Sequence, residues 1–187
     1  MTLIALFFLA SAAGFLLEVG YARLMNLPRT GRKCLLFFPL CPVYGAAAVV
    51  LTLLPEELRS VPALFALLGG CLATATEYLF SLYYEKRWHV RFWDYSQLPF
   101  QLAGRVSLIF SLIWGGLILL CFPPLLALAG QLVGILSPAL LAGLVWALCF
   151  DWMVNGLLLR RTGDRQRLRW WLSQPGPGHG QERFPIL

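Results

Sequence analysis

The chain has 187 residues, of which 59% are apolar and 13% are charged, and its mean hydropathy is +0.71. A soluble domain carries about 25% charged residues, so this composition excludes an ordinary soluble globular protein and favours a protein that lies in lipid. The formal net charge is +6, but the basic residues gather in short segments between apolar ones, which argues against a nucleic-acid-binding surface.

Five apolar segments are candidate membrane spans, because a spanning helix needs about 17–25 mostly apolar residues. They are residues 3–21, 37–54, 61–84, 106–122 and 139–159. The apolar residues 125–136 are too few to cross, and we expect them to form a surface or re-entrant helix after a break at Pro123 and Pro124. The sequence therefore predicts an all-α polytopic membrane helix bundle with about five transmembrane helices.

The positions of the basic residues predict the orientation of this bundle. Every lysine and arginine except Arg59 falls on one side of the five predicted spans, and the positive-inside rule assigns that side to the cytoplasm. We therefore expect the N-terminus outside and the C-terminus in the cytoplasm. Residues 1–159 would form the five-span transmembrane domain, and residues 160–187 a basic cytoplasmic tail. A cleaved signal peptide is the alternative for the first segment, but residues 1–9 contain no basic residue.

No metal site or cofactor is expected from the sequence. The five cysteines are scattered without a Cys-x-x-Cys pair, and the only histidines are His89 and His179. The chain also lacks the Gly-x-x-x-x-Gly-Lys-Ser/Thr loop that holds nucleotide phosphates, so an ATPase would be a separate chain.

Three acidic residues lie inside predicted spans: Glu18, Glu77 and Asp151. Carboxylates in the membrane usually face a cavity or a partner, because they cost a few kcal/mol when unpaired. Helical spacing places each acid on a face with small or polar residues, and a similar stripe in the fourth span includes Ser111. Tyr44 lies at the start of the second span, where two prolines and a glycine could unwind the end of the helix. The alternative, which we favour, is a simple helix with a proline in its first turn.

Two interpretations of these polar residues remain open. In the first, the acids and Arg105 line a polar cavity that opens towards the cytoplasm. In the second, they form buried pairs that hold the helices in register, such as Glu18 or Glu77 with Arg105 and Asp151 with Asn155.

The connection between the third and fourth spans is dense in polar and aromatic residues. Trp93, Asp94 and Tyr95 could form a lid over a binding site, or they could anchor the chain in the membrane–water boundary, where aromatic rings gather. Because both ends of this connection meet at the inner boundary, we expect Asp94 and Arg105 to share one cytoplasm-facing site with Glu77 and Tyr44.

Several short segments also resemble a known family. They are FWDYS at 92–96, GR at 104–105, SLIWG at 111–115, PLCPVYG at 39–45, and Gly14 with Glu18 as Gly-x-x-x-Glu. This pattern resembles the CmpB-type family of bacterial ABC transporter permeases over about residues 14–115. The resemblance implies a small multi-span membrane protein of the bacterial cytoplasmic (inner) membrane.

From the residues and the resemblance we predict a permease-like membrane protein that binds or moves a small polar or amphiphilic ligand through a cytoplasm-facing acidic cavity. The alternatives are a non-catalytic assembly or lipid-organising protein, and an intramembrane enzyme acting on a lipid headgroup, for which no nucleophile or metal motif is present; we do not expect an enzyme. The expected partners are membrane lipid and either a separate ATPase subunit or further copies of the chain. The predicted ligand-binding residues are Glu18, Tyr44, Glu77, Trp93, Asp94, Tyr95, Arg105, Ser111 and Asp151.

Overall fold

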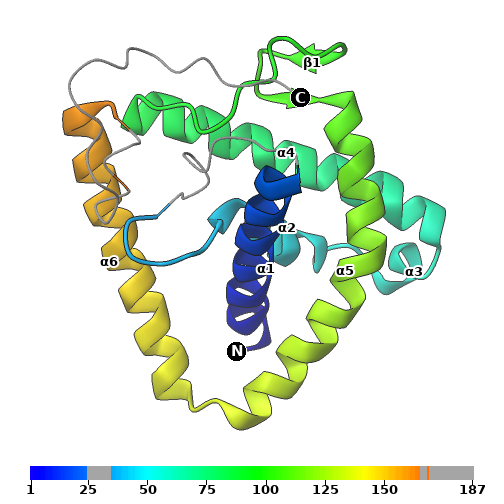
Figure 1. Cartoon of the computed structure of the whole chain (residues 1–187). Coiled ribbons are helices and arrows are strands. Elements are labelled where there is room, and N and C mark those ends of the chain that lie inside the picture. The colour runs from blue at the N-terminus through cyan, green and yellow to red at the C-terminus, as the bar shows by residue number, and fades with distance from the viewer. Residues whose placement is uncertain (25–34, 165–167, 169–187) are drawn as a thin grey trace.

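The computed structural model describes residues 1–24, 35–164 and 168, and it is mostly helical (Figure 1). In chain order the elements are α1 (Thr2–Leu24), α2 (Pro42–Leu51), α3 (Glu56–Arg59), α4 (Pro62–Trp88), β1 (Gln101–Leu102), β2 (Val106–Ser107), α5 (Leu108–Ile135) and α6 (Pro138–Thr162). The two short strands pair antiparallel as a hairpin between α4 and α5. The predicted all-α polytopic bundle is confirmed.

Four helices among the described residues are long and apolar enough to cross a membrane: α1, α4, α5 and α6. The second predicted span, residues 37–54, instead contains α2, which has only ten residues. The reason lies in its prolines, because Pro42 begins the helix and Cys41 before it is extended, with φ −110° and ψ 94°. The first residues of the predicted span are therefore not helical, and only its second part forms a helix.

The prediction of a helix break at Pro123 and Pro124 is wrong. Both prolines lie inside α5, and residues 125–135 continue the same helix. A proline removes one backbone hydrogen bond and bends a helix, but membrane helices tolerate this when neighbouring groups compensate. Figure 1 shows α5 curving along its length before it meets α6. No separate surface helix forms here, and α6 begins after a short turn with Ser137 as its cap.

Helices α1, α2, α4 and α5 pack closely together at glycine residues. A Cβ on Gly70 of α4 would lie 2.9 Å from the carbonyl oxygen of Ser111, and a Cβ on Gly115 of α5 would lie 2.8 Å from that of Ala66. A Cβ on Gly45 of α2 would lie only 2.2 Å from Ser11 Oγ of α1. Side chains at these positions would push the helices apart, so small residues set the packing.

The last helix, α6, lies at the edge of this bundle (Figure 1). Its second half contacts the other elements, where Asp151 bonds to the segment before α2 and the Trp152 indole donates to Tyr83 Oη at 3.2 Å. Its outward side is apolar and exposed, with Trp146 77% exposed and Phe150 56% exposed. The predicted domain boundary at residue 159 falls within α6, and most of the predicted tail lies outside the described residues.

Candidate functional site

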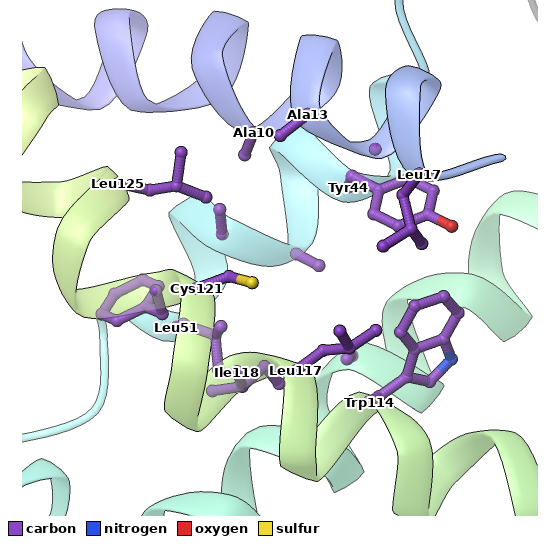
Figure 2. A pocket seen from close by; sticks show the side chains of 15 residues that line it. Ala10, Ala13, Leu17, Tyr44, Leu51, Trp114, Leu117, Ile118, Cys121 and Leu125 are labelled. Carbon is purple, nitrogen blue, oxygen red and sulfur yellow. The ribbon is translucent and has the colours of Figure 1, made fainter. Parts of the chain in front are cut away.

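A pocket of about 130 Å³ lies between α1, α2 and α5, with one side chain from α4 (Figure 2). Its lining is uncharged and almost wholly apolar, which differs from the acidic cavity that we expected. The lining residues are Ala10, Ala13, Gly14, Leu17, Tyr44, Ala47, Ala48, Leu51, Ala73, Trp114, Leu117, Ile118, Cys121, Phe122 and Leu125.

Two aromatic rings close one end of this pocket. Tyr44 of α2 and Trp114 of α5 meet edge to face, with ring centroids 5.4 Å apart. Each ring bonds to an acid through its polar atom: Tyr44 Oη donates to Glu18 Oε1 at 2.8 Å, and Trp114 Nε1 donates to Glu77 Oε2 at 3.0 Å. In Figure 2 the Tyr44 hydroxyl and the Trp114 nitrogen point away from the Leu125 end of the pocket. The two acids therefore lie next to the pocket, behind its aromatic end.

Glu77 is buried, with 7% of its surface exposed, and the loop after α4 supplies its second partner. Tyr95 Oη donates to Glu77 Oε1 at 2.9 Å, and the Tyr95 ring stacks on Phe110 of α5 with centroids 4.7 Å apart. Within the described part of the chain, both hydrogen-bond partners of Glu77 are neutral aromatic donors. A buried carboxyl group held only by neutral donors next to a pocket is a candidate for ligand recognition.

The spacing of residues along α4 explains why these groups meet. Gly70, Ala73 and Glu77 follow the i, i+3, i+7 pattern, so they share one face of the helix. Gly70 brings α5 close, Ala73 lines the pocket, and Glu77 reaches Trp114. Ser111 lies one turn before Trp114 and accepts a hydrogen bond from Thr74 Oγ1 at 2.8 Å, so this predicted site residue bridges α4 and α5 beside the pocket.

The basic residues of the loop bind a different acid. Arg105 forms an ion pair with Glu85 at the end of α4, and its guanidinium lies 5.7 Å from the Tyr78 ring centroid. Arg91 shares Glu85 at 2.9 Å, and this hydrogen bond raises the pKa of the Arg91 guanidinium above its ordinary value. The pairing of Arg105 with Glu18 or Glu77 that we considered is therefore wrong, because Glu85 is the nearer acid.

Trp93 and Asp94 shape the loop itself. The Trp93 indole donates to the Arg105 carbonyl at 2.9 Å, and Asp94 Oδ1 accepts from the Ser96 backbone at 2.9 Å in a local turn. Gly104 has a φ of +67°, and a Cβ there would lie 2.8 Å from Asp94 Oδ1. Of the four residues expected to share one site, Glu77 and Tyr44 lie at the aromatic end of the pocket. Asp94 bonds within the loop, and Arg105 pairs with Glu85 of α4.

Asp151 lies in a second polar region, apart from the pocket. Its side chain is completely buried and accepts hydrogen bonds from three successive backbone N–H groups before α2. These are Leu36 at 3.0 Å, Phe37 at 3.1 Å and Phe38 at 2.9 Å, and Asn155 Nδ2 donates at 3.1 Å. The predicted pairing of Asp151 with Asn155 is present, but three of the four groups that donate hydrogen bonds to Asp151 are backbone N–H groups.

The sequence did not assign a role to Trp114 or to the apolar pocket. Trp114 stood within the segment SLIWG, three residues after Ser111 and so on the same helix face. That spacing was the available signal, but its bond to Glu77 depends on how closely α4 and α5 approach.

These features define a polytopic helical membrane protein with a small apolar pocket whose aromatic end is bonded to acids. The sequence model of the family described as "Putative ABC-transporter type IV" (CmpB) matches residues 5–158. The chain belongs to this family, and the resemblance seen in the short segments is confirmed. No curated protein and no solved structure matches the chain. Among the described residues, no group of three or more His, Cys, Asp and Glu side chains could hold a metal ion.

Proposed function

We propose that this protein is a non-catalytic membrane component of an ABC-type transport system, and that it binds a small amphiphilic ligand in the pocket between α1, α2 and α5. The observation that carries this proposal is the sharp change in polarity at Tyr44 and Trp114. On one side of the two rings the lining is apolar, and on the other side their polar atoms bond to Glu18 and Glu77. A ligand with an apolar body and one polar group matches such an end.

The remaining parts of the proposal concern partners and placement. The family description names an ABC transporter, and such transporters need an ATPase, which we propose to be a separate chain. We place the protein in the bacterial cytoplasmic membrane with its N-terminus outside. We propose that residues 37–54, with the short helix α2, form a further crossing, so that the loop with Arg91 and Arg105 faces the cytoplasm, as the positive-inside rule requires.

Photolabelling with 3-azibutanol, a small neutral photoreactive alcohol, tests the pocket. We expect saturable labelling of Tyr44 or of the α5 residues Leu117 and Cys121, identified by peptide mass spectrometry in lipid nanodiscs. Ala47→Phe places a ring in the pocket and should abolish the saturable part. The matched control is Ala142→Phe on the exposed side of α6, which should leave labelling unchanged. Labelling of α5 that never saturates, or that survives Ala47→Phe, would overturn the proposal.

A further inference from the structure

We infer that the ligand of this pocket is a small organic cation, such as an ammonium with a compact apolar substituent. The inference rests on the proposed function, since it names the chemical class of the ligand for the same site. It follows from three features of the pocket: the electronic state of its two aromatic rings, the charges around it, and its size.

The first feature is that both rings at the end of the pocket donate hydrogen bonds to carboxyl groups. Tyr44 Oη bonds to Glu18 and Trp114 Nε1 bonds to Glu77. Donation to a carboxylate shifts electron density from the O–H or N–H bond into the ring, so the faces of the ring become more negative. Rings of this kind attract ammonium groups, and tryptophan is the strongest of the aromatic side chains in this respect.

The second feature is the sign of the surrounding charge. The pocket lining contains no charged residue, and the carboxyl groups of Glu18 and Glu77 are the acidic groups bonded to its end. Both described hydrogen-bond partners of Glu77 are neutral, and Arg105 is held by Glu85. An ammonium at the aromatic end would be attracted by the Glu77 carboxyl group, and an anion would be repelled, because charges interact strongly where water is scarce.

The third feature is the pocket volume of about 130 Å³. An engineered apolar cavity of about 150 Å³ in another protein holds one benzene molecule. The apolar part of the ligand is therefore about one small ring or a short alkyl group, and a long lipid chain would not be contained. The phenyl ring of benzyltrimethylammonium matches this apolar part, and its ammonium group carries a permanent charge, which makes it a suitable probe.

The test compares this probe with two close analogues. Neopentylbenzene replaces the nitrogen by carbon and keeps the shape without the charge, and phenylmethanesulfonate carries a negative charge. Full-length protein in nanodiscs of zwitterionic lipid is titrated with each radiolabelled compound, and binding to empty nanodiscs is subtracted. We expect saturable binding of the cation, about 2- to 30-fold tighter than that of neopentylbenzene, and no saturable binding of the sulfonate.

Variants at the aromatic end test whether these residues cause the preference for the cation. Glu77→Gln removes the charge behind Trp114, and Trp114→Phe keeps a ring but removes the N–H donor. Both should reduce the preference for the cation over neopentylbenzene, while Trp146→Leu on the exposed side of α6 should not. If both compounds bind equally and Ala47→Phe abolishes both, the pocket is a ligand site and the inference about charge is overturned. If neither compound binds saturably, the inference is overturned together with the proposed pocket.

Discussion

Glu77 and Asp151 are both buried acids in membrane-spanning helices, but their surroundings differ in kind. Glu77 bonds to two side chains, the Trp114 indole and the Tyr95 phenol, beside a pocket. Asp151 bonds to three backbone N–H groups of the bent segment before α2 and to Asn155. The first arrangement can change when a ligand arrives, because side chains can rotate. The second replaces hydrogen bonds that the backbone itself lacks.

This difference indicates that intramembrane acids should be judged by their donors. Backbone N–H groups in the hydrocarbon region must be satisfied within the protein, and the segment before α2 has no helix to do so. Asp151 supplies the acceptors that allow this segment to lie at the start of α2. We therefore propose that Asp151 supports the fold and that Glu77 serves the pocket.

The largest expected effect comes from Asp151→Asn. The amide offers one acceptor oxygen instead of two and turns its NH₂ group towards backbone donors, so at least one buried N–H loses its partner. We expect a loss of about 3 kcal/mol in the free energy of unfolding, measured by titration with a denaturing detergent. Asp94→Asn is the matched control, because Asp94 lies in an exposed turn, and it should cost less than about 1 kcal/mol. Equal losses of stability in the two variants would contradict the structural role of Asp151.

A smaller loss is expected from Gly45→Ala, which acts on the pocket side. The new methyl group would meet Ser11 Oγ and the Phe7 carbonyl, so α2 must shift from α1 and move Tyr44 with it. We expect a loss of about 1–3 kcal/mol in the same titration. In contrast, a Cβ on Gly20 of α1 has open space around it, and Gly20→Ala should stabilise the helix by about 0.5–1 kcal/mol. Destabilisation by Gly20→Ala as large as that by Gly45→Ala would contradict the packing described here.

Glu77→Gln should change the free energy of unfolding by only about 1 kcal/mol. The glutamine oxygen still accepts from one of the two donors, and Tyr95 and Trp114 are side chains that can turn towards new partners. The same variant should lose the preference for an organic cation. A collapse of folding as severe as that of Asp151→Asn would mean that Glu77 is also structural.

The smallest effect is expected from Arg105→Lys. Lysine keeps the charge near Glu85 but loses the planar fork and the contact with the Tyr78 ring. Glu85 is one-third exposed at its side chain, so solvent weakens the pair and the cost should be about 0.5–1 kcal/mol. Arg91→Lys is the control, because the Arg91 side chain is 41% exposed, and we expect no measurable loss in thermal unfolding. A larger loss in Arg91→Lys would reverse the assigned roles of the two arginines.

The sequence predicted the helices that consist of one long, uninterrupted run of mostly apolar residues. The expected segments 3–21, 61–84 and 139–159 correspond to α1, α4 and α6. The second helix begins at a proline, Pro42, as expected, but it is much shorter than the predicted span 37–54. The prediction failed at Pro123 and Pro124, which lie inside α5. Whether a proline ends a helix depends on neighbouring groups that satisfy the freed backbone, and a single sequence does not contain that information.

The sequence indicated polar residues that lie beside the pocket, but it did not indicate the apolar pocket itself. Helical spacing drew attention to Glu18 and Glu77, and the prolines and glycine around Tyr44 drew attention to that residue. The three residues meet at the end of the pocket through Trp114. The sequence grouped Asp151 with them because all of the acids lie in spans. The separate role of Asp151 depends on backbone donors more than 110 positions away in the chain, which no local pattern reveals.

The most direct test of the separation between Glu77 and Asp151 measures unfolding and benzyltrimethylammonium binding on the same nanodisc preparations of Glu77→Gln and Asp151→Asn. We predict that Asp151→Asn loses about 3 kcal/mol of stability, while its folded fraction binds the cation with nearly unchanged affinity. We predict that Glu77→Gln stays within about 1 kcal/mol of the parent protein and binds the cation more weakly. The opposite pattern, with binding lost in Asp151→Asn and stability lost in Glu77→Gln, would contradict the assignment of one acid to the fold and the other to the pocket.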